Sequence, residues 1–259
     1  AAPSAPDLAA ASDSGVSSTD DITNDTTPTF EGTAEANAIV RLYADGEEVG
    51  SATADENGNW SVTGSTLAEG VHAFTARAED AAGNLGAASA ALGVTLDATV
   101  PTAASTPDLA TAADSGNSST DEVTNATSLT FTGTAGANAT VTLLIGGVDT
   151  GVSVTADDVG NYSIVYDASG LSDGDYTFSS RASDAAGNTS TASGGLTVTI
   201  DRTAAEPTPS LDAGSDSGTP GDGITSDTTP NFVGSGAEAG ATVYLYADGE
   251  EIAQATVSV

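Results

Sequence analysis

Acidic loops that recur along the chain carry the clearest chemistry in this sequence. Residues 13–24 contain three aspartates and an asparagine among serines and a glycine, and the pattern returns at 114–125 and, more loosely, at 216–227. Calcium binds about six to eight oxygen atoms from carboxylates, amides, carbonyls and water. Because these loops contain no basic residue, their carboxylates repel one another unless a cation neutralises them. The loops therefore predict calcium sites, with a solvated acidic loop as the alternative.

A second acidic motif, Asp-Ala-Ala-Gly-Asn, occurs at 80–84 and again at 184–188. Its side chains are calcium ligands by type, but a plain Asx or glycine turn explains the spacing nearly as well. Both interpretations stay open at this point. The candidate metal ligands from the loops, from this motif and from the expected strand ends are Asp13, Asp20, Asp21, Asp80, Asp97, Asp114, Asp121, Asp157, Asp184, Asp201, Asp216 and Asp222.

The charge of the chain indicates cations as partners. It carries 37 acidic and 4 basic residues, a net charge of −33. Such a chain is repelled by phosphate backbones and by anionic membranes, so we expect neither nucleic acid binding nor membrane insertion. Since the chain has no cysteine, bound metal is the expected substitute for disulfides in small extracellular modules. It has a single histidine and no lysine, which leaves no catalytic constellation, and we expect no enzyme.

The elements that hold these loops belong to an internal repeat of about a hundred residues, which is too long for a solenoid and predicts a domain per copy. Residues 58–61, Gly-Asn-Trp-Ser, return at 160–163 as Gly-Asn-Tyr-Ser. We expect domains at 1–100, 101–204 and 205–259, called the first, second and third repeats below. The third is expected to be truncated to the N-terminal half of a domain, with an open apolar face. Without a signal peptide, the chain is expected to be an internal part of a longer protein.

Short runs of alternating polar and apolar residues, bounded by Gly, Asn, Asp and Ser, predict strands throughout each repeat. In the first repeat they fall near 28–34, 38–44, 48–54, 59–63, 71–79 and 91–97, after a leading strand near 6–11. About seven short strands per hundred residues is typical of an immunoglobulin-like sandwich. The predicted fold class is therefore all-β, with tandem immunoglobulin-like β-sandwich domains. The alternation places Phe30, Val40, Leu42 and Trp60 in the core.

Topology decides which acidic groups can meet at the joint between repeats. In a seven-strand sandwich the first loop and the end of the last strand lie at one pole, and the chain enters at the other. The groups expected to face one another across residues 98–102 are Asp13, Asp20 and Asp97 from the first repeat and Asp157, Asp158 and Asp184 from the second. By the same argument Asp114, Asp121 and Asp201 should face the third repeat. A calcium ion between such groups would make the joint rigid.

Four strings of residues are specific in combination: 23–34, 42–46, 52–61 and 78–84, the last two containing Asn-Gly-Asn-Trp-Ser and Asp-Ala-Ala-Gly-Asn. The chain resembles the tandem bacterial Ig-like domains of large surface and type I-secreted adhesins of the RTX and biofilm type. The resemblance covers nearly the whole chain. It implies a sandwich fold, an extracellular location on the bacterial surface or after secretion, and calcium near domain junctions. His72, in place of a tyrosine-like residue, departs from the pattern.

These features together predict a calcium-stiffened extracellular stalk or spacer of a bacterial adhesin that supports cell adhesion or biofilm formation. Its expected partners are neighbouring Ig-like repeats of the same polypeptide, while other domains would bind a host or surface receptor. The alternative is an adhesion module that binds a glycan or a protein through outward-facing Tyr43, Tyr244 and Tyr246.

Overall fold

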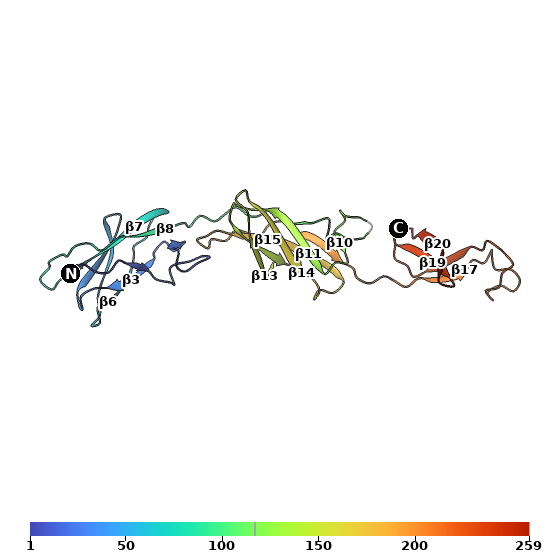
Figure 1. The fold of residues 1–259 in the computed structure, drawn as a ribbon, viewed down its shortest axis with the longest axis horizontal. Coiled ribbons are helices and arrows are strands. Elements are labelled where there is room, and N and C mark those ends of the chain that lie inside the picture. Colours follow the sequence, from blue (N-terminus) through green and yellow to red (C-terminus); the bar gives the residue numbers. More distant parts are fainter. Residues whose placement is uncertain (117, 259) are drawn as a thin grey trace. The chain divides into compact units, whose positions relative to one another are not determined.

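The computed structural model describes residues 1–116 and 118–258, and it is built from β-strands (Figure 1). The described residues form no helix, and so none that is long and apolar enough to span a lipid bilayer. The chain divides into two compact units. One comprises Ala1–Leu171 and Asp175–Thr199, and the other comprises Ser172–Gly174 and the residues from Ile200 onward.

The strands of the first repeat form two sheets, drawn in blue and cyan in Figure 1. They are β1 (Asp7–Leu8), β2 (Ile22–Thr23), β3 (Thr29–Thr33), β4 (Ile39–Ala44), β5 (Glu47–Thr53), β6 (Asn59–Thr63), β7 (Gly70–Glu79) and β8 (Leu92–Leu96). One sheet has the order β1-β3-β6 and the other β2-β8-β7-β4-β5. The predicted all-β sandwich is therefore confirmed. The sequence analysis missed β2, a two-residue strand that pairs with β8 in parallel.

The core of the first repeat lies between these two sheets. Phe30, Val40, Leu42 and Phe74 are fully buried, and Trp60 is 3% exposed. The rings of Phe30 and Phe74 lie 4.1 Å apart between centroids, one from each sheet. Burying one such side chain stabilises the fold by about 1.5–3 kcal/mol, so the predicted alternation supplies the main stabilisation of the sandwich.

The second repeat has the same construction. Its strands are β9 (Asp108–Leu109), β10 (Val123–Thr124), β11 (Ser128–Thr134), β12 (Thr140–Ile145), β13 (Val148–Thr155), β14 (Asn161–Asp167), β15 (Gly174–Ser183) and β16 (Leu196–Ile200). The sheets have the orders β14-β11-β9 and β10-β16-β15-β12-β13. Phe131 and Phe178 take the places of Phe30 and Phe74, with their ring centroids 4.5 Å apart.

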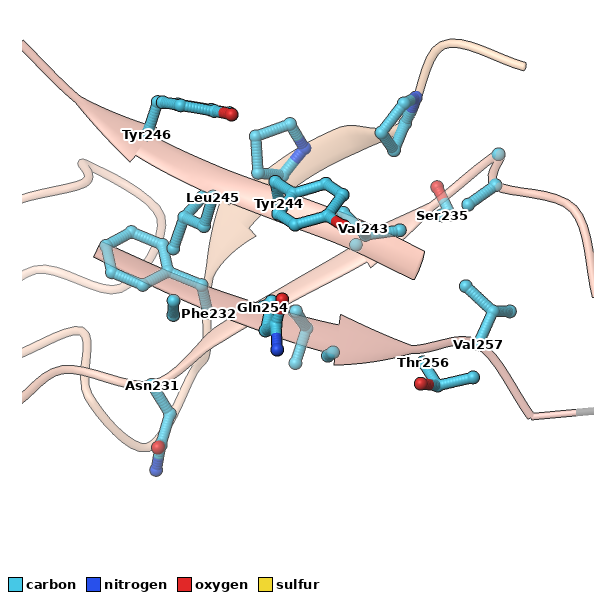
Figure 2. A pocket seen from close by; sticks show the side chains of 18 of the residues that line it. Asn231, Phe232, Ser235, Val243, Tyr244, Leu245, Tyr246, Gln254, Thr256 and Val257 are labelled. Atoms are coloured by element: carbon cyan, nitrogen blue, oxygen red, sulfur yellow. The ribbon is translucent and has the colours of Figure 1, made fainter. Parts of the chain in front are cut away.

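The third repeat has an open face. Its strands are β17 (Thr208–Leu211), β18 (Phe232–Ser235), β19 (Thr242–Ala247) and β20 (Glu250–Thr256), in two two-stranded sheets. Phe232 is 45% exposed, whereas its counterparts Phe30 and Phe131 are fully buried. A groove of about 620 Å³ runs along this face, and Figure 2 shows its lining, which includes Phe232, Val243 and Leu245. The expected open apolar face is confirmed.

His72 on β7 forms hydrogen bonds through both nitrogens of its ring, one to Asp45 and one to the backbone of Ala68. Nδ1 lies 2.7 Å from Asp45 Oδ2, and Nε2 lies 2.8 Å from the carbonyl oxygen of Ala68. Both partners are acceptors, so both bonds form when the imidazole is protonated. The Ala68 carbonyl and the Asp45 carboxylate raise the pKa of His72, while the Ala73 amide and His72 lower the pKa of Asp45.

A pH dependence confined to the first repeat follows from this pair. A raised pKa in the folded state stabilises the repeat below the unfolded pKa of about 6.5, and this stabilisation is lost as the pH rises through the folded value. Urea unfolding at pH 6 and pH 9 should show the loss in the first repeat, and His72→Gln should abolish it. The second repeat, with Tyr176 at this position, is the internal control. An unchanged pH dependence in the His72→Gln variant would contradict this role.

Candidate metal centre

The first acidic loop is held in shape by its own polar side chains. Ser14 Oγ donates to Asn24 Oδ1 at 2.9 Å, and the Asn24 amide donates back to Ser14 Oγ at 2.8 Å. In the second repeat Ser115 and Asn125 form the same two bonds, at 2.8 and 2.9 Å. The amide oxygens of Asn24 and Asn125 therefore shape the loop and already have a donor each.

Asp13 and Asp114 are buried at equivalent places in these loops. Each is 5% exposed, and Oδ1 of each has no hydrogen-bond partner among the described residues. Oδ1 of Asp216 in the third repeat is also buried without a partner in that part of the chain. A buried carboxylate oxygen without a donor or a cation strongly destabilises a fold. The same unpartnered carboxylate oxygen recurs in every repeat, within the described residues.

Other carboxylates raise the pKa values of Asp21 and Glu122, the acidic residues that follow Asp20 and Asp121. Burial raises the pKa of Asp21, and the charges of three neighbours raise it further, namely Asp13, Asp7 and Asp20. Burial likewise raises the pKa of Glu122, with further contributions from Asp114, Asp108 and Asp121. We call these two sets, Asp7, Asp13, Asp20 and Asp21, and Asp108, Asp114, Asp121 and Glu122, the acidic clusters. The sequence analysis missed Asp7 and Asp108 as site residues, although the recurring Pro-Asp-Leu at 6–8 and 107–109 could have indicated them.

The backbone at Asp21 and Glu122 adopts a left-handed conformation, with φ of 57° and 60°. Residues other than glycine rarely adopt this backbone conformation, and holding them in it costs about 1–3 kcal/mol. In the third repeat the same position is Gly223, with φ of 70°. The turn is thus common to all three repeats, but the first two place a carboxylate on it at an energetic cost.

The donor set of the acidic clusters fits a hard cation. It contains oxygen atoms alone, which Ca²⁺ and Mg²⁺ prefer as ligands, and the unpartnered Oδ1 of Asp13 or Asp114 is the atom that a cation would neutralise. As the side chains stand in the described residues, no group of three or more His, Cys, Asp or Glu is placed so as to hold a metal ion. A cation would therefore have to draw the cluster together.

The aspartates of the second motif close turns. Asp80 Oδ1 accepts the amides of Ala82 and Asn84 at 2.9 and 2.8 Å, and its Oδ2 accepts Asn84 Nδ2 at 2.9 Å. The Asn84 bonds lower the pKa of Asp80. Asp184 binds Asn188 in the same way, and Asp157 binds Asn161. The turn explains these residues structurally, and calcium at Asp80, Asp157 and Asp184 stays a prediction.

Several of the remaining candidates share one local role, because each accepts a hydrogen bond from the amide two residues further on. The pairs are Asp20 with Ile22, Asp97 with Thr99, Asp121 with Val123, Asp201 with Thr203 and Asp222 with Ile224. Asp216 Oδ2 accepts the Gly221 amide at 2.5 Å. In each case one carboxylate oxygen is engaged in the loop.

The first loop also forms the contact between the first two repeats. Ser14 Oγ lies 2.8 Å from the carbonyl oxygen of Ala186, so its single proton is shared between that oxygen and Asn24 Oδ1, and the Val16 amide donates to the carbonyl of Ala185 at 3.3 Å. Asn188 Nδ2 donates to the carbonyl of Asp97 at 2.7 Å. The first loop and Asp97 therefore lie against the 184–188 motif, and the predicted facing of Asp13, Asp20 and Asp97 with Asp157, Asp158 and Asp184 stays a prediction. Asp13 of the acidic cluster directly precedes Ser14, which forms this contact.

A pair of glycines allows the contact to be tested. A Cβ on Gly15 would lie 2.0 Å from the carbonyl oxygen of Ala185, whereas a Cβ on Gly116 would meet no atom of the described residues within 4 Å. Their φ angles, 105° and 110°, impose equal strain on alanine. We expect Gly15→Ala to speed hydrogen exchange at the Val16 amide and to loosen the joint, measured by residual dipolar couplings. Gly116→Ala is the matched control, and equal effects of the two variants would mean that the contact contributes nothing.

Comparison with known proteins places these features in a wider context. A family model described as "Bacterial Ig-like domain" matches residues 1–98, 99–202 and 203–259. Comparison with curated proteins gave no match. Among solved structures, "Biofilm associated protein - BSP domain" is 21% identical, with 76% of this chain and 29% of that chain covered and a TM-score of 0.26.

Two further solved structures are similar to the chain. The one described as "Ca2+-stabilized adhesin helps an Antarctic bacterium reach out and bind ice" is 25% identical, with 100% of this chain and 64% of that chain covered and a TM-score of 0.41. The fibronectin(III)-like modules of Clostridium thermocellum CbhA are 19% identical, with 69% and 87% covered and a TM-score of 0.42. The chain spans less than two thirds of the length of the biofilm-associated protein and of the ice-binding adhesin.

Proposed function

The chain belongs to the bacterial Ig-like domain family, and we propose that it is a calcium-stiffened, extracellular stalk segment of a bacterial adhesin that supports cell adhesion or biofilm formation. Its repeats, at 1–100, 101–204 and 205–259, serve as spacers, and neighbouring repeats of the same polypeptide are its direct partners. Receptor binding belongs to other domains. Secretion by a type I system, as for RTX adhesins, is part of the same proposal.

One observation carries the proposal: within each acidic cluster lies a buried carboxylate oxygen, Oδ1 of Asp13 or Asp114, that has no partner among the residues the structure describes. In the first repeat the next residue, Ser14, contacts the second repeat. A bound calcium ion would supply positive charge to the cluster and fix the loop. Since this loop is half of the joint, ordering it would restrict bending between the repeats. Asp13, Asp20 and Asp21 would hold the ion, with Asp7 beside them.

Calcium titration of the whole chain tests this function. Binding of an ion at a hundred times its Kd stabilises the folded state by about 2.7 kcal/mol, and for a domain of this size each kcal/mol raises the Tm by about 4–8 °C. We therefore expect the Tm of the first two repeats to rise by about 10 °C or more. Small-angle scattering should show a narrower distribution of interatomic distances. If calcium leaves both the Tm and the scattering unchanged, the stalk proposal fails.

Sodium chloride at equal ionic strength is the control for this titration. Salt screens the repulsion among the acidic side chains without occupying a defined site. If sodium chloride reproduced the whole effect of calcium, screening of the net charge would explain the stabilisation, and the specific sites would be excluded.

A further inference from the structure

Glu69 binds the residues through which the chain leaves the first repeat. Gly70, the first residue of β7, pairs with Leu96 at the end of β8, so Glu69 lies beside the linker that follows β8. Its Oε1 accepts the Ala98 amide at 3.1 Å, and Thr99 Oγ1 lies 2.9 Å from each of its carboxylate oxygens. Hydrogen bonds to a charged acceptor are stronger than those between neutral groups. The linker is therefore fixed to the repeat that it leaves.

The second repeat has the same contact with a shorter side chain. Asp173 Oδ1 accepts the Arg202 amide at 3.1 Å, and its Oδ2 accepts the Thr203 hydroxyl at 2.8 Å. These two donor residues correspond to Ala98 and Thr99. An amide and a hydroxyl of the outgoing chain thus bind a carboxylate in both repeats, although the acidic residue differs.

A glycine directly after each carboxylate shapes the turn that carries it. Gly70 and Gly174 have φ of 136° and 142°, a backbone conformation that glycine alone adopts readily. A Cβ on Gly70 would meet no atom of the described residues within 4 Å. Conformation, and not lack of space, therefore requires glycine here, and this turn places Glu69 against the linker.

The linker is also held at its start by the second repeat. Asn188 Nδ2 donates to the Asp97 carbonyl at 2.7 Å, and the Thr99 amide donates to Asp97 Oδ1 at 3.0 Å. Further along, Pro101 has a fixed φ and restricts Val100 to extended conformations. Few backbone bonds of the linker are then left about which one repeat could turn relative to the other.

We propose that Glu69 is a positioning residue that fixes the direction in which the chain leaves the first repeat, and that Asp173 has the same role in the second. The contact joins a carboxylate to donors of the protein itself, so it forms without calcium. Neither residue belongs to the acidic clusters. The inference therefore does not rest on the proposed calcium stiffening, which would add to a restraint that the linker already supplies.

Residual dipolar couplings of the whole ¹⁵N-labelled chain in chelator test this role, because they report the alignment of each repeat separately. We expect the first and second repeats to align to the same degree in the native chain and to different degrees in Glu69→Ala. Exchange of the Ala98 amide should become about tenfold faster, as expected for the loss of roughly one hydrogen bond to a charged group. The Tm should change by less than about 4 °C, since Glu69 is exposed.

Two further comparisons separate the contact from general effects. Glu56→Ala removes the same charge from an exposed turn of the same repeat, and it should leave the alignment unchanged. Thr99→Val removes the hydroxyl and keeps the shape of the side chain, whereas Thr99→Ser keeps the hydroxyl. Thr99→Val should change the alignment in the same direction as Glu69→Ala, and Thr99→Ser should retain the native alignment.

Equal alignment of the two repeats in Glu69→Ala would overturn the proposal. So would unequal alignment in the native chain, an equal change in Glu56→Ala, or identical behaviour of Thr99→Val and Thr99→Ser. Calcium that altered neither the Tm nor the scattering would instead contradict the proposed function, and it would leave the role of Glu69 standing.

Discussion

Replacing Asp13 by asparagine is expected to stabilise the first repeat in chelator and to destabilise it in calcium. Without a cation, the substitution removes the negative charge of a carboxylate whose Oδ1 is buried and has no partner in the described part of the chain. This charge also raises the pKa of Asp21. With calcium, the same substitution removes a ligand. The sign of the effect therefore reverses with the metal, which a purely structural role of Asp13 does not predict.

The expected size of this reversal is large. In chelator, a gain of about 1 kcal/mol corresponds to an increase in Tm of about 4–8 °C for one repeat. In saturating calcium, loss of the site removes about 2.7 kcal/mol. Calorimetry of Asp13→Asn and Asp114→Asn, each with and without calcium, measures both values. Glu56→Gln removes the same charge from an exposed turn, and it should shift the Tm equally under both conditions. Destabilisation by Asp13→Asn in chelator would refute the assignment of a cation site.

Replacing the equivalent phenylalanine of each repeat by alanine should strongly destabilise the first and second repeats and have little effect on the third. Phe30 and Phe131 are fully buried, whereas Phe232 is 45% exposed. Truncation of a buried phenylalanine costs about 3–5 kcal/mol, a large part of the 5–15 kcal/mol that stabilises a typical domain. Phe232→Ala should cost less than about 1 kcal/mol, as at other exposed sites.

Trp60 makes this series easy to follow, because it is the sole tryptophan of the chain and lies in the core of the first repeat. In urea, Phe30→Ala should shift the transition in tryptophan fluorescence to lower concentration. Phe131→Ala should leave that transition nearly in place while destabilising the second repeat, followed by its amide signals. If Phe131→Ala moved the tryptophan transition as far as Phe30→Ala does, the repeats would unfold as one unit and separate domains would be excluded.

The strands and the core could be predicted from the sequence because each alternation of polar and apolar residues occurs in both the first and the second repeat. The expected strands near 59–63 and 71–79 agree closely with β6 and β7, since their apolar residues alternate for five or more positions. β2 offers two residues, Ile22 and Thr23, and no alternation. Its position depends on pairing with β8, a long-range contact that local patterns do not report.

The candidate site was predictable in part. Asp13 and Asp114 were recognisable from composition and recurrence, but their burial follows from the tertiary fold. Asp7 and Asp108 stand at the start of β1 and β9, outside the loops whose charge they share, and only the fold brings their charge to bear on Asp21 and Glu122. Asp80 shows the opposite difficulty, because a turn and a cation ligand require the same residues at the same spacing. Hydrogen bonds from the neighbouring amides separate the two roles only once the structure is known.

The parallel pairing of β2 with β8 determines how a repeat responds to tension. The Thr95 amide donates to the Asp21 carbonyl at 2.8 Å, and the Asp97 amide donates to the Thr23 carbonyl at 2.9 Å. Pulling the two termini of the repeat apart drags these strands past each other along their length, so the bonds are loaded in shear and must rupture together. Forced unfolding is governed by the rate of that rupture. Since Asp21 belongs both to this clamp and to the acidic cluster, an ion bound there would strengthen the repeat at the point that bears the load.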